Sequence, residues 1–203
     1  MSAEHYFSET PATEFKAREI EITLDGRRVR MTTAGGVFSP EHLDTGTAVL
    51  LEHLDEVPSG GNILDVGCGW GPIALAIAAR SPKATVWAID VNARSRELTT
   101  LNASRLGLNN VRVCAPEDVP VDVRFTGIWS NPPIRVGKAE LHAILQTWLP
   151  RLEFAGEAFL VVQKNLGADS LLRWMQTELA NNLHSERVDS SKTFRVLRVT
   201  RKD

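Results

Sequence analysis

Hydrophobic residues follow two different periods along this chain, and the period changes near residue 60. Before that point, the segment EIEITLDGRRVRM (19–31) alternates apolar and polar positions on both sides of Asp25-Gly26. A period of two indicates half-buried strands, and an Asp-Gly pair between two such runs is a strong hairpin signal. We therefore predict a β-hairpin here, then a loop over residues 32–46 and a helix from Thr47 to about Leu54.

From Asn62 onward, short apolar runs alternate with segments of helical period. The predicted strands are NILDV (62–66), TVWAID (85–90), VRVC (111–114), FTGIWS (125–130), AFLVVQ (158–163) and two in the final segment 185–200. The predicted helices are 71–80, 93–107, 140–152 and 168–182. Strands alternating with helices predict a parallel sheet covered on both faces, and the handedness of the crossovers makes it doubly wound. The final pair adds an antiparallel C-terminal strand, so we predict an α/β fold with a seven-stranded sheet.

Composition is typical of one globular domain, with 203 residues of which 43% are hydrophobic and 24% charged. The two cysteines, Cys68 and Cys114, form no CxxC pair, so we expect a reducing compartment and no metal site. No apolar run approaches the length of a membrane span and the first residues show no signal peptide, so we expect a cytoplasmic protein without a membrane partner.

A net charge of −2 excludes the overall positive field that marks many nucleic-acid binders. Basic residues do cluster locally, in the Arg27–Arg30 segment and in the last 18 residues of the chain. We interpret these clusters as solvated surface, with a local RNA-facing patch as the alternative.

The segment LDVGCGWGP joins the first predicted strand of the sheet to a helix and carries a D-x-G-x-G-x-G pattern. Ligands of open α/β sheets bind beyond the carboxyl ends of the strands, at such loops. A dinucleotide fingerprint would need a small residue at position 72, which is Pro72. Asp65 would repel a pyrophosphate but suits a ligand with positive charge, and Asp90 ends the second strand, where an acid can bind both ribose hydroxyls.

This combination resembles the class I S-adenosylmethionine-dependent methyltransferases, whose donor carries a sulfonium and an ammonium. The resemblance implies a Rossmann-like sheet, with residues 1–46 as hairpin and lid segment and residues 47–203 as the methyltransferase domain of one compact unit. It also implies that Glu117 or Asp118 lies near the adenine, without deciding which. The residues that it assigns to the donor around the glycine loop and the second strand are Asp65, Gly67, Cys68, Gly69, Gly71, Asp90 and Val91.

The fourth strand ends in SNPPI (130–134), where two consecutive prolines form a stiff loop. This loop resembles the N-P-P-[FYW] motif of methyltransferases that act on exocyclic or amide nitrogens. Such a nitrogen is a poor nucleophile, and two acceptors on its N–H bonds can orient it toward the methyl group. The candidates are the side-chain oxygen of Asn131 and the main-chain carbonyl of Pro132, with Pro133 stiffening the loop. Catalysis would then rest on positioning and electrostatic preorganisation, without a strong general base.

The segments HYFSETP (around Tyr6), GVFSPEHLDTGT, NPPIRVGKAELH, VVQKNLGA and FRVLRV together resemble the small domain of bacterial ribosomal RNA guanine-N2 methyltransferases. This likeness implies a 16S ribosomal RNA or small-subunit partner. It also implies a lid of Phe38, Asp44, Gly46 and Thr47 near the methionine end of the donor, although Asp44 also suits a helix N-cap. Arg135 and Lys138 are candidates for phosphate contact, or are simply solvated charges.

Two departures from the family pattern affect the substrate assignment. The aromatic residue of the motif is Ile134 here, which loses base stacking worth ~1–3 kcal/mol. Larger relatives carry an additional N-terminal domain that helps to hold RNA, and we expect this chain to lack it. A paired guanine could not reach a deep pocket, so we expect a single-stranded or flipped target nucleotide.

The leading hypothesis is therefore an RNA guanine-N2 methyltransferase that acts on 16S ribosomal RNA. Methylation of a protein glutamine or of adenine N6 would use the same motif and remains an alternative. A methyltransferase-like RNA-binding module without activity is a further alternative, against which Asp65, Asp90 and Asn131 argue. The oligomeric state is left open.

Overall fold

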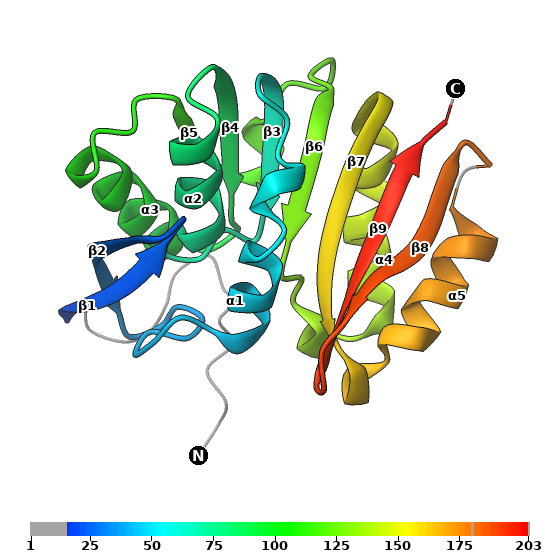
Figure 1. The fold of residues 1–203 in the computed structure, drawn as a ribbon, viewed down its shortest axis with the longest axis horizontal. Helices are drawn as coiled ribbons and strands as arrows, with labels where there is room; N and C mark the ends of the chain where they lie inside the picture. Colours follow the sequence, from blue (N-terminus) through cyan, green and yellow to red (C-terminus); the bar gives the residue numbers. More distant parts are fainter. Residues whose placement is uncertain (1–15, 180, 203) are drawn as a thin grey trace.

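The structure of the protein is a computed structural model that describes residues 16–179 and 181–202. Its centre is a seven-stranded sheet in the order β5-β4-β3-β6-β7-β9-β8 (Figure 1). Six of these strands run in the same direction, and β9 runs in the opposite direction between β7 and β8. This confirms the predicted doubly wound sheet with an antiparallel C-terminal strand. The strands are β3 (Gly61–Val66), β4 (Ala84–Ile89), β5 (Val111–Cys114), β6 (Phe125–Ser130), β7 (Leu152–Gln163), β8 (Leu183–Ser190) and β9 (Phe194–Arg201).

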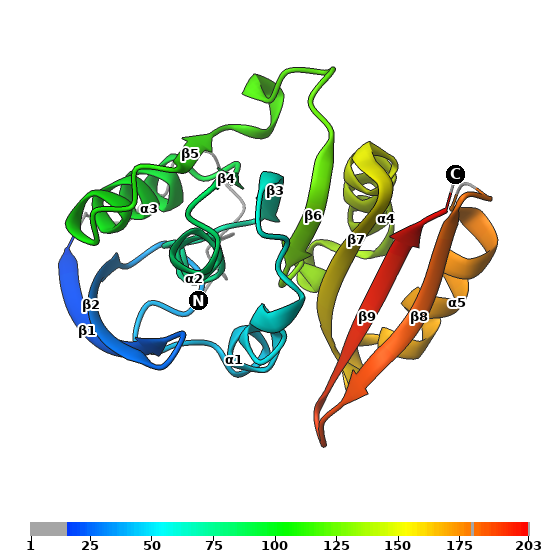
Figure 2. The same ribbon diagram turned by 45° about the horizontal axis from the view of Figure 1, so that its top comes forward.

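The predicted hairpin forms a separate two-stranded sheet of β1 (Ala17–Leu24) and β2 (Arg27–Ala34). Its turn residues, Asp25 and Gly26, have φ angles of 45° and 74°. Positive φ at both central positions is the requirement of the type I′ turn, which suits the twist of a hairpin. The hairpin lies along the outer side of α3 (Ala93–Arg105) (Figure 2).

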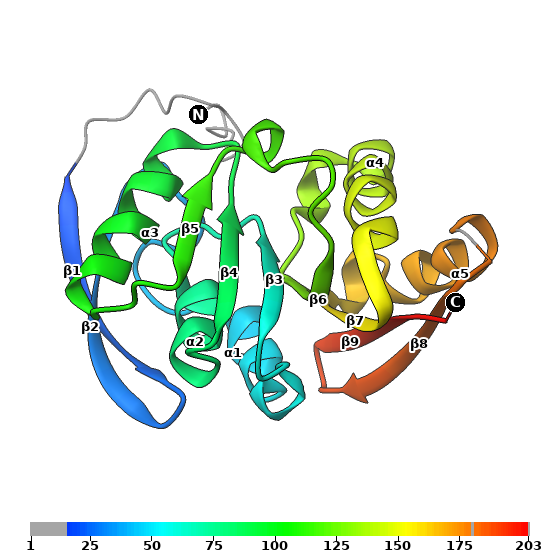
Figure 3. The same ribbon diagram turned by 90° about the horizontal axis from the view of Figure 1, so that it is seen from above.

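Helices cover both faces of the large sheet (Figure 3). One face packs against α1 (Thr45–Leu51), α2 (Pro72–Arg80), α3 and the hairpin, and the other packs against α4 (Lys138–Trp148) and α5 (Ala168–Glu178). Neighbouring strand residues therefore enter different cores, as is typical of strands that are buried on both sides. Short 3-10 segments complete the connections, namely η1 (Leu54–Glu56), η2 (Pro116–Asp118), η3 (Ile134–Val136), η4 (Leu149–Arg151) and η5 (Lys164–Leu166).

The boundaries around β7 differ from the prediction. The helix expected over 140–152 ends at Trp148, and the strand expected from Ala158 begins at Leu152. Pro150 falls in η4, where it cannot supply the N–H that a continuing helix needs. Residues 153–155 are exposed, and Ala155 has a φ of 57°. Because three consecutive residues are exposed, the first part of β7 lacks the apolar run by which we predicted its second part.

Strand register brings the predicted site loops together. Val66 pairs with Ile89, and Asp65 pairs with Trp129, so β3, β4 and β6 end almost level. The loops that follow these strands therefore leave one edge of the sheet side by side, with each pair of adjacent strands about 5 Å apart. Because β9 is antiparallel to β7, its first residue, Phe194, also lies at this edge, paired with Gln163.

Asn102 joins the hairpin to α3 and is fully buried. Its Oδ1 accepts a hydrogen bond from Thr32 N (2.7 Å), and its Nδ2 donates to Thr32 O (2.8 Å) and Trp70 O (2.9 Å). We expect Asn102→Ala to lower the free energy of unfolding by about 3 kcal/mol, because it leaves three buried backbone groups unpaired. Urea unfolding tests this, with the exposed neighbour Leu101→Ala as the control within about 0.5 kcal/mol of wild type. Equal stabilities of the two variants would contradict it.

Candidate active site

The glycine loop is fastened to the end of β4 through its backbone. Gly67 N and Cys68 N both donate to Ile89 O, at 2.9 and 3.0 Å, and Gly69 N donates to Asp90 Oδ2 at 2.9 Å. These bonds hold the loop across the carboxyl ends of β3 and β4. They also place Asp90 directly beside the glycine loop, and its contact with the ribose of a donor stays a prediction.

The outer side of this loop is open. Gly67 and Gly69 have φ angles of 78° and 57°, and a Cβ added to either would meet no atom within 4 Å. Gly71 differs, because its Cβ would lie 3.1 Å from Leu75 and Thr99. The Cys68 side chain is buried, with Sγ 3.6 Å from Thr99 Oγ1. The loop therefore offers a ligand its backbone and open space, and it turns the Cys68 side chain into the core.

Asp90 keeps hydrogen-bonding capacity for a ligand. Its Oδ1 accepts from Asn92 N at 2.8 Å, while Oδ2 accepts from Gly69 N. The Ser95 side chain also donates to this carboxylate. A carboxylate has about four acceptor positions, so about one remains for a further donor such as a ribose hydroxyl. Burial raises the pKa of Asp90, against the hydrogen bonds from Asn92 and Gly69 that lower it. The next residue, Val91, is 44% exposed and presents an apolar surface beside this carboxylate.

Asp65 lies beneath the loop and is completely buried. Its Oδ2 accepts from Ala74 N (2.9 Å) in the first turn of α2, and its Oδ1 has no hydrogen-bond partner among the described residues. Burial, with a smaller contribution from the nearby Asp90, raises the pKa of the Asp65 carboxyl to about 8, against the hydrogen bond from Ala74 N that lowers it. Asp65 thus supports the glycine loop from within, and direct contact between Asp65 and a ligand stays a prediction.

Asn131 is held in one orientation by the start of α1. Its Nδ2 donates to Asp44 Oδ2 at 2.8 Å and to Thr47 Oγ1 at 3.0 Å. Asp44 also caps α1, because the same Oδ2 accepts from Thr47 N at 3.0 Å. The alternative reading of Asp44 as an N-cap is therefore correct, and the second role of this residue is to bind Asn131. Because a carboxylate oxygen accepts, the amide must present its NH₂ to Asp44, which leaves Oδ1 as the unused acceptor.

The two prolines shape the rest of this loop. Pro132 O accepts a hydrogen bond from Ile134 N at 2.8 Å, and Pro133 has φ −74° and ψ 78°, as in an inverse γ-turn. The carbonyl of Pro132 keeps a second lone pair for another donor. The Ile134 side chain is half-buried and packs against the core on the α4–α5 side of the sheet.

Residues 35–39, in the segment predicted to form a lid, are joined by hydrogen bonds to the glycine loop and to the start of α3. Asn92 Nδ2 donates to Gly36 O (2.8 Å), Arg94 NH1 donates to Gly35 O (2.7 Å) and Trp70 Nε1 donates to Ser39 O (3.2 Å). Phe38, within this segment, is 46% exposed.

Sequence reasoning missed Asn92, Arg94 and Trp70, which hold residues 35–39 in place. The only local signal was Asn92, whose Oδ1 accepts from Arg94 N at 2.9 Å in the N-cap of α3.

Other predicted residues lie at the rim of the site. Glu117 and Asp118 are both exposed in η2 after β5, and their geometry does not decide between them. Lys138 is exposed at the start of α4, and Arg135 lies in η3 with its side chain outside the described part of the chain. Tyr6 falls outside the described residues.

Residues 16–179 and 181–202 contain no group of three or more metal-binding side chains, and none of their helices is long and apolar enough to span a membrane.

The strand order and the loops at the carboxyl edge of this sheet define the class I methyltransferase fold. The sequence profile of the methyltransferase small domain family matches residues 28–198, and the chain belongs to this family. This confirms the class I S-adenosylmethionine-dependent methyltransferase that the sequence predicted.

Relatives and solved structures agree with this assignment. The uncharacterized protein YbxB of Bacillus subtilis is 36% identical over 177 residues, which cover 86% of this chain and 88% of that protein. Ribosomal RNA small subunit methyltransferase C of Pseudomonas entomophila is 31% identical over 95% of this chain, which spans 57% of that relative. The T. thermophilus 16S rRNA N2 G1207 methyltransferase (RsmC), in complex with AdoMet and guanosine, superimposes with a TM-score of 0.77 at 22% identity, over 95% of this chain and 52% of that one.

The raised pKa of Asp65 predicts a pH-dependent stability. In the donor-free protein the folded state holds a proton between pH 3.8 and about 8 that the unfolded state has released, so this contribution to stability falls as pH rises through that window. Asp65→Asn removes this dependence. The stability of Asp65→Asn relative to wild type should therefore rise by about 1.4 kcal/mol per pH unit from pH 5 to 7.

Urea unfolding at several pH values measures this difference. The exposed Asp122→Asn is the matched control, because it makes the same Asp-to-Asn change at the surface. A pH-independent difference for Asp65→Asn would mean that Asp65 is already ionised in the folded protein.

Proposed function

We propose that this protein methylates the exocyclic N2 amine of a guanine in 16S ribosomal RNA, with S-adenosylmethionine as the methyl donor. The observation that carries the proposal is the orientation of Asn131. Both hydrogens of its amide bind the start of α1, so the amide oxygen remains as an acceptor at the end of β6. That end is level with the glycine loop after β3.

The residues present fit the donor. Gly67 and Gly69 leave open space above the loop, and the Asp90 carboxylate, which accepts from Asn92, Gly69 and Ser95, keeps about one acceptor position for a ribose hydroxyl. Val91 offers its exposed side chain to an adenine, and Glu117 or Asp118 can bind the adenine amine from η2. When bound, S-adenosylmethionine supplies an electrophilic methyl group on a sulfonium.

The chain's own contribution is to position the nucleophile. An exocyclic amine has two N–H bonds, which Asn131 Oδ1 and Pro132 O can accept. The Pro132 carbonyl also accepts from Ile134 N, so the amine takes its second lone pair. Two fixed acceptors orient the nitrogen lone pair along the line to the methyl carbon and favour the positive charge that develops on nitrogen. The nitrogen releases its surplus proton after transfer, so no strong base is needed.

The substrate class rests on the relatives. Those named as ribosomal RNA small subunit methyltransferase C cover most of this chain, and the T. thermophilus neighbour is named for N2 of G1207 in 16S rRNA. Exposed Lys138, seven positions after Asn131, can contact an RNA phosphate near the site, and Arg135 can do the same.

Product identification tests the substrate. The protein is incubated with tritiated donor and, separately, small ribosomal subunits, protein-free 16S rRNA, tRNA and a release factor, and the labelled product is digested. We expect label in N2-methylguanosine from 16S rRNA. Label found only in glutamine or N6-methyladenosine would assign the site to the alternative substrates. Absence of donor binding by calorimetry would leave only an inactive RNA-binding module.

We expect Asn131→Ala to lower the methyl-transfer rate by about 10²–10³-fold, because it removes one of two acceptors in a preorganised site. Donor affinity, measured by calorimetry, should stay within about threefold of wild type. Full turnover in this variant would exclude the acceptor mechanism.

Exchanging the amide and the carboxylate between positions 131 and 44 tests whether the Asp44–Asn131 hydrogen bond contributes to methyl transfer. Asn131→Asp keeps an acceptor oxygen but places a second carboxylate against Asp44, so we expect activity to fall. Adding Asp44→Asn restores an amide–carboxylate pair and should recover part of the rate. Equal rates in the single and double variants would show that the Asp44–Asn131 hydrogen bond does not matter for transfer.

A further inference from the structure

The turn between β8 and β9 is followed by Phe194, whose ring lies beside the residues that bind the Asn-Pro-Pro loop. Phe194 packs with the core on the α1–α3 side of the sheet and is only partly buried. A Cβ added to Gly46 would lie 2.9 Å from Phe194 Cε1 and 3.0 Å from Asp44 Oδ2. The ring therefore rests on the first turn of α1, next to the carboxylate oxygen that binds Asn131. Gly46 makes room for this ring.

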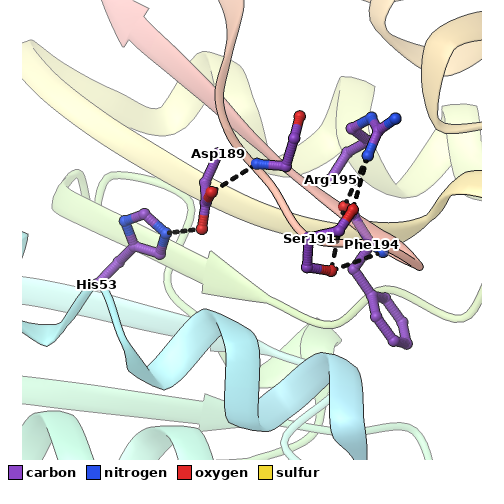
Figure 4. A network of polar contacts seen from close by, with 6 residues as sticks. His53, Asp189, Ser191, Phe194 and Arg195 are labelled. Atoms are coloured by element: carbon purple, nitrogen blue, oxygen red, sulfur yellow. Dashed lines mark hydrogen bonds and ion pairs between the residues drawn. The ribbon is translucent and has the colours of Figure 1, made fainter.

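The turn that carries Phe194 is held by several hydrogen bonds (Figure 4). Phe194 N donates to Ser191 Oγ (2.9 Å), and Arg195 NH1 donates to the carbonyls of Ser191 (3.0 Å) and Phe194 (3.1 Å). Lys164 N donates to Thr193 O at 2.8 Å. Figure 4 shows the Phe194 ring and the Arg195 guanidinium leaving the turn on opposite sides. The ring thus belongs to a preorganised turn.

A second contact joins this turn to the other end of α1. His53 Nε2 lies 3.3 Å from Asp189 Oδ2, near the end of β8 (Figure 4). The His53 ring also stacks on Phe159, at a centroid distance of 6.0 Å. The end of β8 therefore contacts the chain just after α1, and Phe194, the first residue of β9, contacts the beginning of α1. This double attachment sets the position of Phe194 relative to Asp44 and Asn131.

Ile134, which follows the two prolines, and Phe194, beside the Asp44 carboxylate that binds Asn131, belong to opposite layers of the fold. Ile134 packs against the α4–α5 core, and Phe194 packs on the α1 side, with Asn131 at the strand end between these layers. A flat base whose amine is bound by Asn131 would lie between an aliphatic wall and an aromatic wall. Only the aromatic wall offers a π-face for stacking.

We propose that Phe194 is the stacking residue for the target base and thereby a determinant of substrate specificity, in the place of the aromatic residue that Ile134 replaces. This inference rests on the proposed function. It explains how the site can bind a planar base without an aromatic residue in the Asn-Pro-Pro loop itself.

The test is steady-state methyl transfer to whichever of 16S rRNA or small subunits the wild-type protein labels. Phe194→Leu should lower kcat/KM roughly 5- to 150-fold, mainly by raising KM for the RNA, because stacking contributes to base binding. Phe194→Tyr and Phe194→Trp keep a π-face and should stay within about threefold of wild type. The matched control is Phe154→Leu, an exposed phenylalanine near the opposite end of β7, which should match wild type.

A rescue variant separates stacking from packing. Adding Ile134→Phe to Phe194→Leu supplies an aromatic wall from the other layer and should recover at least part of the lost kcat/KM. Thermal unfolding and donor affinity are measured for every variant, and Phe194→Met, which fills a similar volume without a ring, takes the place of Phe194→Leu if that variant does not fold.

Two results would overturn the inference while leaving the proposed function intact. One is an active wild type with an unchanged kcat/KM in Phe194→Leu or Phe194→Met. The other is an equal loss in the leucine, tyrosine and tryptophan variants without recovery by Ile134→Phe, which would mark Phe194 as a packing residue. Failure of the wild-type protein to label any RNA would instead remove the proposed function, and this inference with it.

Discussion

The site depends on one carboxylate oxygen that serves two parts of the chain. Asp44 Oδ2 accepts from Thr47 N, which starts α1, and from Asn131 Nδ2, which follows β6. Because both donors share this acceptor, the orientation of the Asn131 amide is tied to the position of α1. That helix start in turn supports Phe194 through Gly46. The positions of Asn131, the start of α1 and Phe194 are therefore fixed relative to one another.

The donor side of the site follows a different physical rule. Its contacts come from backbone groups and from acids at two depths. Asp90 is partly accessible and shares its oxygens with backbone N–H groups, whereas Asp65 is fully buried beneath the loop. Burial without a charged partner favours the neutral form of a carboxyl, which accounts for the raised pKa of Asp65. A cationic donor bound above the loop would oppose this effect and lower the pKa of Asp65.

The Asn-Pro-Pro loop is suited to positioning. Proline removes N–H groups and fixes φ, so the loop holds its carbonyl and amide oxygens with little freedom to lose on binding. The residue that follows the two prolines, Ile134, packs against the α4–α5 core and has no aromatic ring. The antiparallel β9 brings a phenylalanine to the same edge from the other layer. The aromatic residue that the family motif has at position 134 is therefore absent from the loop, and an aromatic side chain, Phe194, stands at the same edge of the sheet about 60 residues further along the chain.

By itself, the sequence determined the features that local patterns report. The strands Val111–Cys114 and Phe125–Ser130 match their predicted bounds, the Asp25-Gly26 hairpin is present, and the glycine loop and Asp90 follow neighbouring strands. Periodicity and turn chemistry depend on neighbouring residues, so they can be read along the chain. Only the tertiary structure decided that Asp44 binds Asn131, 87 positions away, that Asp65 is fully buried, and that Phe194 rests on Gly46. Those contacts depend on strand order, register and the direction of β9, which bring distant residues together in ways that no local period records.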